Sequence, residues 1–343
     1  MRLGVLDIGS NTVHLLLVDA HPGARPTAYA DHKRPLSLIR RLDDDGAITA
    51  EGVQDLIGFI REAVAFAERN GAEDMIAFCT SAIRESANGA EVLEEVTRTS
   101  GVHLAELTGD QEAAMTYFAV RRWHGWHVEH LLNFDIGGGS FEISYGVDEL
   151  PSRAVSVPLG AQRLTRDFLD SADPPKPKAL KKIRKHIETV LAEQVPGFPA
   201  LPAGTVVTGT SKTFRSLARI AGAAPYSDGP FVPRYLELQD LRRWNSRLST
   251  MTVEERSELP GVSELRAPQI LAGGLVAEAA LRAFGVERIL ICPWALREGL
   301  IMGRLDALLM DGVIGREVEP WVGHVNLTPG SQAPGFSVGV VGA

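Results

Sequence analysis

Apolar and polar residues recur along the chain in two similar sets of short runs. Residues 3–19 (LGVLDIGSNTVHLLLVD) hold an apolar run, the triplet Asp-Ile-Gly, a small polar turn and a second alternating run. Residues 131–148 (LLNFDIGGGSFEISYGVD) repeat this order, with Asp135 standing 128 positions after Asp7. A period of that length matches a domain rather than a solenoid repeat, so the pattern indicates a duplication.

The first half of the chain alternates between strand-like and helix-like patterns. Its longest helical pattern begins after Thr49, a good N-cap, and ends before Gly71, a residue suited to the position after a helix. We expect strands near residues 3–7, 13–18, 27–31, 74–79 and 103–107, and helices near 49–70, 89–100 and 111–123.

The second half repeats this order with one helical insertion. We expect strands near residues 131–135, 141–146, 153–157, 205–208 and 288–292, and helices near 161–170, 177–194, 212–221 and 295–310. The domains expected are a first at 1–125, joined by the C-terminal helix 296–310, and a second at 126–295 with its insertion at 236–284. Residues 311–343 are rich in glycine, and we expect a poorly ordered tail there.

Composition narrows the class of protein. The 343 residues are 45% hydrophobic and 23% charged, which is typical of a globular chain. A net charge of −8 argues against nucleic acid as a partner. Cys79 and Cys292 end apolar runs and are expected to be buried thiols, not disulfide or zinc ligands. No apolar run spans a membrane and Asp7 interrupts any signal peptide, so we expect a cytoplasmic protein without a membrane partner.

The repeated turn is suited to binding phosphate. Glycine leaves the backbone N–H groups of a tight hairpin unobstructed, and such a turn can donate them to phosphate oxygens. Asp7 and Asp135, at the strand ends, can hold Mg²⁺ beside that phosphate. A single turn of this kind could equally be a plain hairpin. Two matched turns favour a pair that grips a polyphosphate across a cleft between the domains.

Six short motifs of the chain are typical of one protein family. They are DIGSNT (7–12), TSAIRES (80–86), TGDQEA (108–113), DIGGGSFE (135–142), TGTSKTFRSL (208–217) and LREGL (296–300). Together they resemble the exopolyphosphatase / guanosine pentaphosphate phosphohydrolase family, in its short form without an HD-type domain. The resemblance spans residues 1 to about 310. It implies an α/β fold of two ribonuclease H-like domains, as in actin, sugar kinases and Hsp70, with a central cleft between them.

The resemblance also implies roles for individual residues. Glu112 would activate the attacking water, with Asp110 as its local rival; its plain alternative is to complement a helix dipole. Asp7, Asp135 and Glu142 would hold Mg²⁺ or Mn²⁺. The residues expected to bind substrate phosphates are Gly9, Ser10, Asn11, Thr12, Ser81, Arg84, Gly137, Gly138, Gly139, Ser140, Gly209, Ser211, Lys212 and Arg266.

Three positions depart from the family's usual pattern. Phe141 replaces a threonine but should point away from the cleft, because Ser140 and Glu142 share the other side of the strand. Lys212 replaces a small residue and favours bare polyphosphate over a nucleotide. Pro268 replaces an aspartate two residues after Arg266. The basic run 181–186 (KKIRKH) is either a solvated helix face or a remote polyphosphate track.

The function expected is hydrolysis of terminal phosphoanhydride bonds of inorganic polyphosphate. Three alternatives stay open: the same chemistry on guanosine pentaphosphate, a sugar or acetate kinase, and a non-catalytic sensor of polyphosphate or alarmone. The kinase would need a second glycine after Gly209, where Thr210 stands, and the presence of Glu112 argues against the sensor. The family implies a homodimer.

Overall fold

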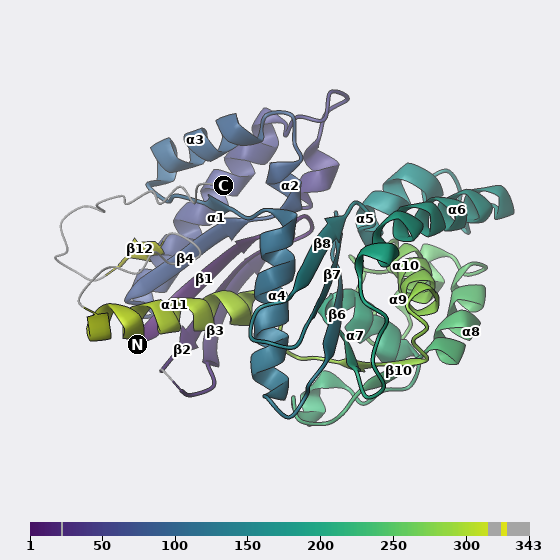
Figure 1. Cartoon of the computed structure of the whole chain (residues 1–343). Helices are drawn as coiled ribbons and strands as arrows, with labels where there is room; N and C mark the ends of the chain where they lie inside the picture. Colours follow the sequence, from purple (N-terminus) through teal and green to yellow (C-terminus); the bar gives the residue numbers. More distant parts are fainter. Residues whose placement is uncertain (22, 315–323, 328–343) are drawn as a thin grey trace. The chain divides into compact units, whose positions relative to one another are not determined.

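The protein divides into two compact units. The structure, a computed structural model, describes residues 1–21, 23–314 and 324–327. Unit 1 comprises Met1–Thr108 together with the chain from Arg297 onward, and unit 2 comprises Gly109–Leu296 (Figure 1). The C-terminal helix α11 (Leu296–Ile314) therefore lies almost wholly in unit 1.

Unit 1 is built on a mixed sheet. Its strands are β1 (Arg2–Ile8), β2 (Val13–Asp19), β3 (Thr27–Arg34), β4 (Asp74–Cys79), β5 (Ala105–Glu106) and β12 (His324–Asn326). Their order is β12-β4-β1-β2-β3, with β5 also pairing with β4. The first three strands are antiparallel neighbours, whereas β4 runs parallel to β1. All six residues of β4 are buried, as expected for a central strand covered on both faces.

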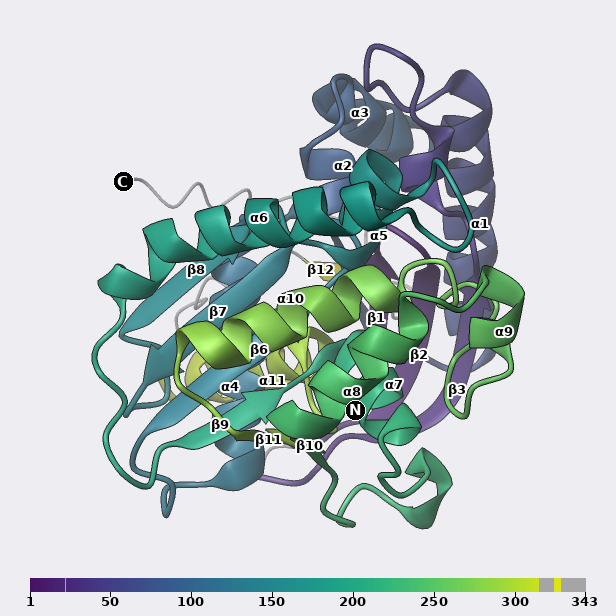
Figure 2. The same cartoon turned by 90° about the vertical axis from the view of Figure 1, so that its right-hand side faces the viewer.

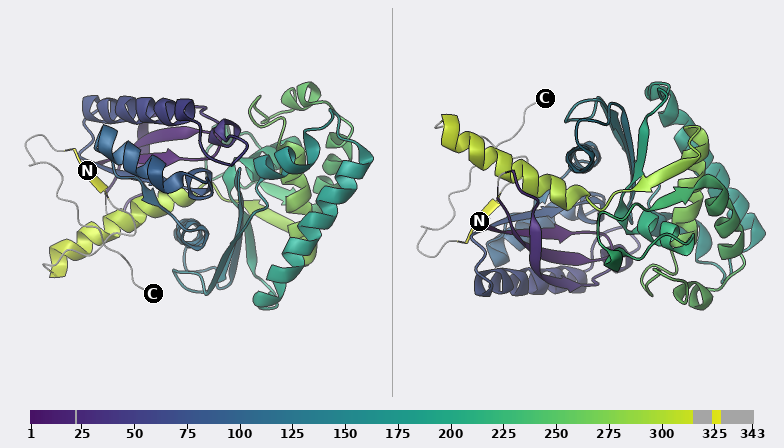
Figure 3. Two further views of the ribbon diagram at one scale, coloured as in Figure 1. Left: turned by 90° about the horizontal axis from the view of Figure 1, so that it is seen from above. Right: turned by 90° about the horizontal axis from the view of Figure 1, so that it is seen from below.

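Helices cover both faces of this sheet. They are α1 (Ala50–Arg69), the short α2 (Ser81–Arg84), α3 (Gly89–Ser100) and α11. Figure 3 shows α1 on one face and α11 on the other. The predicted start of α1 is confirmed, since the Thr49 hydroxyl accepts a hydrogen bond from the Gly52 N–H at 3.3 Å. Leu56, Ile57 and Ile60 form the buried stripe that packs on the sheet.

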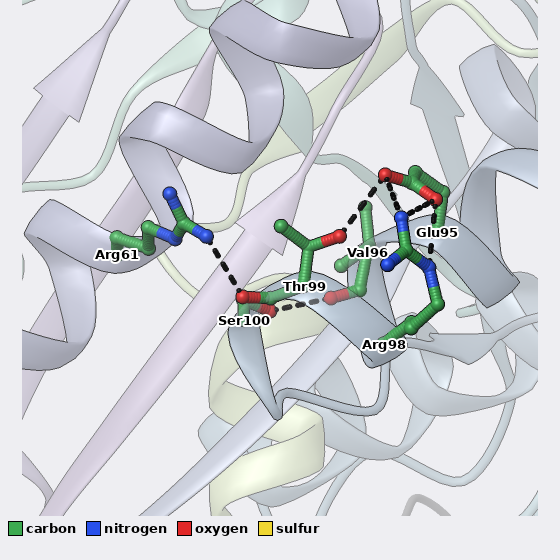
Figure 4. A network of polar contacts seen from close by, with 6 residues as sticks. All are labelled: Arg61, Glu95, Val96, Arg98, Thr99 and Ser100. Carbon is green, nitrogen blue, oxygen red and sulfur yellow. Dashed lines mark hydrogen bonds and ion pairs between the residues drawn. The ribbon is translucent and has the colours of Figure 1, made fainter.

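Polar contacts fasten the end of α3 to α1 (Figure 4). The Arg61 Nη2 donates to the Thr99 carbonyl at 3.0 Å, which satisfies one of the free carbonyls at the helix C-terminus. The Ser100 hydroxyl donates to the Val96 carbonyl at 2.7 Å. Gly101 follows with a φ of 72°, the left-handed conformation that commonly ends a helix.

A buried ion pair joins α11 to the central strand β4. The Nε and Nη2 atoms of Arg304 both lie 2.9 Å from the Asp74 Oδ2, and both side chains are under 10% exposed. Removing one partner would leave an uncompensated buried charge, so the pair holds the C-terminal helix on unit 1 although the two residues are 230 positions apart.

Unit 2 repeats the plan. Its strands are β6 (Leu131–Ile136), β7 (Phe141–Gly146), β8 (Arg153–Val157), β9 (Val206–Gly209), β10 (Tyr235–Glu237) and β11 (Arg288–Ile291), in the order β10-β11-β9-β6-β7-β8. The sequence β8-β7-β6-β9-β11 mirrors β3-β2-β1-β4-β5 in order and direction. The duplication is thus visible in the sheets, and the predicted fold class of two ribonuclease H-like α/β domains is confirmed.

The helices of unit 2 form two layers around its sheet. They are α4 (Gly109–His124), α5 (Ala161–Leu164), α6 (Pro177–Gln194), α7 (Ser211–Ile220), α8 (Leu238–Leu248), α9 (Val253–Ser257) and α10 (Ile270–Ala283). A π-helical turn, Thr165–Leu169, extends α5. Figure 2 shows α6 and α10 on one face of the sheet and α4 on the other. Most of the unit's apolar core lies on the α6–α10 side.

Several sequence expectations are corrected. The boundary between the units falls at residue 108, not 125, because α4 packs on β6, β7 and β8 of the second sheet. The insertion is not continuous helix: it opens with strand β10, and residues 258–269 between α9 and α10 are largely turns. The poorly ordered tail is wrong for residues 311–314, which continue α11, and for β12, which pairs with β4. The remainder of that tail lies outside the described residues.

The expectation for the two cysteines is confirmed: Cys79 and Cys292 are buried and neither forms a disulfide in the described structure. Within the described ranges, every helix is too short or too polar to cross a membrane.

Candidate active site

In the turn between β6 and β7 of unit 2, the carbonyl groups accept hydrogen bonds from the segment at the start of α5. The turn closes with a hydrogen bond from the Gly137 N–H to the Ser140 carbonyl at 2.9 Å. The Gly137 carbonyl accepts from the Ala161 N–H at 3.0 Å. The Gly138 carbonyl accepts from two further N–H groups at the start of α5, those of residues 162 and 163, both at 3.0 Å.

Gly160 and Arg163 complete this support. The Gly139 carbonyl accepts from the Gly160 N–H at 3.3 Å and from the Arg163 Nε at 2.7 Å. A Cβ atom on Gly160 would lie only 2.2 Å from the Gly139 carbonyl carbon. Only glycine permits this approach of the two backbones, a requirement that the sequence reasoning missed. The dipeptide Leu-Gly before a short helix gives no distinctive signal.

The same turn also offers hydrogen-bond donors. Within the described part of the chain, the N–H groups of Gly138, Gly139 and Ser140 have no hydrogen-bond partner, while the carbonyls of Gly137, Gly138 and Gly139 are satisfied. Successive unoccupied N–H groups at a tight turn form a concave site for an anion. The sequence prediction of a phosphate-binding turn is therefore supported by geometry in unit 2.

Two carboxylates stand directly opposite each other beside this turn. Asp135 on β6 is paired in register with Glu142 on β7. Glu142 is 5% exposed, and its Oε1 accepts a hydrogen bond from the Ser156 hydroxyl at 2.8 Å. Burial, followed by the charges of Glu112 and Asp135, raises the pKa of Glu142 well above 4.5. Three acidic groups thus interact at one buried place.

The neighbouring strand and helix supply the partners of Asp135. The Thr210 hydroxyl donates to the Asp135 Oδ2 at 2.7 Å. Burial raises the pKa of Asp135 to about 6, and the hydrogen bond from Thr210 and the charge of Arg215 act in the opposite direction. Thr210 is fully buried, so this contact holds the carboxylate in one orientation.

Glu112 reaches the same cluster from α4. It lies in the first turn of the helix and is 8% exposed, whereas Asp110 in the same turn is exposed. The charge of Glu112 helps to raise the pKa of Glu142, so the two carboxylates interact electrostatically. The interaction is possible because α4 packs on the sheet of unit 2. Of the two acids in this helix turn, Glu112 is thus the buried one whose charge acts on Glu142.

The donors of this cluster suit a divalent cation. Mg²⁺ is commonly held by one or two carboxylates, with water and substrate phosphate completing its shell. Asp135 and Glu142 form such a pair, and burial is the main cause that raises the pKa of each carboxyl group. Among the described residues no group of three or more His, Cys, Asp or Glu side chains is arranged to hold a metal ion. The two carboxylates therefore suit a cation that keeps much of its hydration shell.

Positive charge gathers at the start of α7. Ser211, its first residue, has a φ of 69°, a strained conformation for a residue with a side chain. Lys212 is exposed. The Arg215 Nε donates to the Ser211 carbonyl at 3.2 Å, and the Arg266 Nη1 donates to the Thr213 hydroxyl at 3.3 Å.

These two arginines lack acidic partners. In the described structure neither Arg215 nor Arg266 forms an ion pair with a carboxylate within 4.0 Å. Burial, and next the charge of Arg215, lowers the pKa of Arg266 to about 10. Two adjacent guanidinium groups are suited to the oxygens of an anion. Arg266 was expected from the sequence, whereas Arg215 was missed, because one arginine on a helix has no distinguishing pattern.

The turn of unit 1 has the same closure. The Gly9 N–H donates to the Thr12 carbonyl at 3.2 Å, as Gly137 does to Ser140. The Ser10 and Ser81 hydroxyls lie 3.1 Å apart, which brings the start of α2 to this turn. The Asn11 carbonyl is occupied by the Ser37 N–H at 3.0 Å.

Other residues expected in unit 1 have structural contacts. The Arg84 Nη1 donates to the Leu107 carbonyl at 2.5 Å, so part of its guanidinium already braces the strand end. Asp7 is paired in register with His14. His14 contacts Arg297 of α11 and lies 3.3 Å from the Asp31 carboxylate, a set that the sequence did not connect.

Two units of like topology, with a row of N–H donors beside buried carboxylates in the second, define a phosphate-binding protein of α/β class. The comparison with known sequences makes this specific. The chain belongs to the Ppx/GppA phosphatase family, whose model matches residues 17–308.

Several relatives share most of the chain. It is 50% identical over 309 residues to a Mycobacterium tuberculosis protein named Exopolyphosphatase 1, covering 90% of this chain and 89% of that protein. It is 47% identical to the protein of the same name in Mycobacterium leprae, over 90% of each chain. An uncharacterized protein of Streptomyces coelicolor is 38% identical over 89% of this chain and 91% of its own.

Solved structures agree in fold. A crystal structure of an exopolyphosphatase from Cytophaga hutchinsonii is 25% identical and superposes with a TM-score of 0.79, covering 89% of this chain and 98% of that one. The Ppx/GppA enzyme of Aquifex aeolicus is 26% identical with a TM-score of 0.73, over 88% of this chain and 99% of that chain. The predicted family is confirmed.

Proposed function

We propose that this protein is an exopolyphosphatase, which releases orthophosphate from the end of inorganic polyphosphate. Relatives at about half identity over most of the chain bear that name. The observation that carries the proposal is the turn after β6, where the free N–H groups of residues 138–140 lie beside the half-buried Asp135 and the buried Glu142. A phosphate bound at this turn would lie next to carboxylates that can accept a proton and bind a cation.

Glu112 is proposed to orient and deprotonate the attacking water. Water is a poor nucleophile, and hydrolysis of a phosphoanhydride needs it aligned with the leaving oxygen. Glu112 is buried at the start of α4, and its charge acts on Glu142 of the neighbouring strand. Asp110 in the same helix turn is exposed to solvent, so Glu112 is the better candidate for this role.

The phosphate chain is proposed to be held mainly by N–H donors and guanidinium groups. In unit 2 these are the Gly138, Gly139 and Ser140 amides together with Arg215 and Arg266. The turn of unit 1, with Gly9, Ser10, Asn11 and Thr12, and the residues Ser81, Arg84, Gly209, Ser211 and Lys212 keep the binding role that the family resemblance implies. Preset donors of this kind stabilise charge as it develops on the transferring phosphoryl group.

Asp135 and Glu142 are proposed to hold Mg²⁺ or Mn²⁺ together with water, with Asp7 as a further oxygen donor implied by the family. Such a cation would offset negative charge on the substrate and polarise its phosphoryl oxygens. Each carboxylate accepts a hydrogen bond from one hydroxyl group, Asp135 from Thr210 and Glu142 from Ser156, which helps to orient it.

The test is phosphate release from polyphosphates of defined length and from guanosine pentaphosphate, by wild type, Glu112→Gln and Asp110→Asn. We expect release from polyphosphate to fall about 10²- to 10⁴-fold in Glu112→Gln and to stay near wild type in Asp110→Asn. Equal losses in both variants would reject the assignment of Glu112. Faster release from guanosine pentaphosphate than from any polyphosphate would replace the proposed substrate by the nucleotide.

A further inference from the structure

A cavity of about 280 Å³ lies in unit 2 among residues that the proposed reaction does not use. Its lining residues come from the segment that follows α5, from helix α9 and from Pro268. These segments are joined by a hydrogen bond from the Val253 N–H to the Asp173 Oδ2 at 2.8 Å. The volume is at the lower end for small-molecule sites, so the cavity suits a small metabolite.

The wall of the cavity contains a buried cation without a partner. Arg256 is 2% exposed, and its Nε donates to the Leu248 carbonyl at 3.1 Å. Its Nη2 has no hydrogen-bond partner, and within the described residues no carboxylate forms an ion pair with it. A buried guanidinium in this state is costly, and an anionic group in the adjoining cavity would offset that cost.

Two other buried arginines of the unit show what a satisfied one looks like. Arg121, 1% exposed, donates through its Nε, Nη1 and Nη2 to carbonyl oxygens and to the Tyr117 hydroxyl. Arg234, 7% exposed, donates through all three nitrogens to backbone carbonyls. Arg256 differs from both because its neighbours leave one end of the guanidinium without an acceptor.

The two carboxylates that line the cavity lie at its other end from Arg256. Asp170 and Asp173 line the cavity and are exposed, so they stand where it opens to solvent, whereas Arg256 is in its buried part. The charge of Asp173 opposes the lowering of the Arg256 pKa by burial, so the two ends of the cavity interact without touching. The cavity is therefore positive inside and negative at its entrance.

The remaining lining is largely apolar, with Leu169, Pro175, Val253 and Pro268 among its residues. We propose that this cavity binds a free α-amino acid with an apolar side chain, its carboxylate toward Arg256 and its ammonium group toward Asp170 and Asp173. A bare phosphate or polyphosphate lacks the cationic group and would meet two carboxylates at the entrance. The site is distinct from the phosphate-binding turn, and its test does not depend on the hydrolytic activity.

Isothermal titration calorimetry with L-leucine, L-valine and L-methionine, each added to the full-length protein, tests the proposal. We expect at least one of them to saturate a single site. Isocaproate and isoamylamine, which carry the leucine skeleton without the ammonium or the carboxylate, should bind at least about tenfold more weakly. Failure of all three amino acids to saturate overturns the proposal, as does isocaproate or inorganic phosphate binding there as tightly as leucine.

Variants locate the binding. In the double variant Asp170→Asn, Asp173→Asn the amide oxygen at 173 can still accept from the Val253 N–H, so the fold is retained while the entrance loses its charge. We expect amino-acid affinity to fall at least about tenfold. Asp167→Asn, on the π-helical turn but outside the cavity lining, is the matched control. Unchanged affinity in the double variant, or an equal fall in the control, places the ligand elsewhere.

Discussion

Replacing Gly160 by alanine tests whether the support under the phosphate-binding turn sets activity. Gly160 has φ −66° and ψ 144°, which alanine adopts without strain, so the substitution acts only through the added methyl group. That Cβ would lie 2.2 Å from the Gly139 carbon, 2.3 Å from the Gly138 oxygen and 2.4 Å from the Ser140 nitrogen. All three atoms belong to the turn that presents the N–H donors.

The structure gives the size of the displacement. Real Cβ atoms stay at least 3.0 Å from such neighbours, so the 2.2 Å contact requires the two backbones to separate by about 0.8 Å. A misplacement near 1 Å in a catalytic site can cost about 10²-fold. We therefore expect kcat/KM for phosphate release to fall about 10- to 100-fold, equivalent to about 1.4–2.7 kcal/mol of transition-state stabilisation.

The assay is steady-state phosphate release from polyphosphate, run beside thermal unfolding to show that the variant is folded. The matched control is Gly58→Ala in α1, where an added Cβ has nothing within 4 Å and helix propensity should raise stability slightly. Activity of Gly160→Ala within threefold of wild type would refute the reasoning, because the turn would then tolerate a displaced support.

Further predictions concern stability and binding. Arg304→Met should lower the free energy of unfolding by about 3–5 kcal/mol in chemical denaturation, and adding Asp74→Asn should recover part of it; a full additive loss would contradict the buried pair. Burial lowers the pKa of His124 from 6.5 to about 4. As the pH falls, this histidine is therefore protonated in the unfolded chain before it is protonated in the folded one. The free energy of unfolding of the wild type should fall by up to about 3 kcal/mol between pH 6.5 and 4. In His124→Gln the free energy of unfolding should depend less on pH in this range. The same pH dependence as in the wild type would contradict the lowered pKa of His124. Arg215→Gln should raise KM for polyphosphate about tenfold or more, whereas Arg219→Gln, one turn along α7 and bound to a backbone carbonyl, should leave it near wild type.

The sequence by itself determined the features that depend on neighbouring residues. The Asp-Ile-Gly repeats, the strand at 74–79 and the helix that Thr49 caps were predicted at or within a residue or two of their observed bounds. Side-chain alternation, helical spacing and capping are local properties, and they are legible without knowing where the chain returns. The family motifs also singled out Glu112, Asp135 and Glu142 as candidate residues of one site.

Only the tertiary structure decided which residues meet. The helix that carries Glu112 was expected in the first domain, yet it packs on the second sheet, which lets the charge of Glu112 act on Glu142. Gly160 and Arg215 have no signal in the sequence, because their importance comes from backbone and side-chain atoms of other segments. Burial, which raises the pKa of Asp135 and leaves Arg256 without a partner, depends on packing between distant segments and is set only when the whole unit folds.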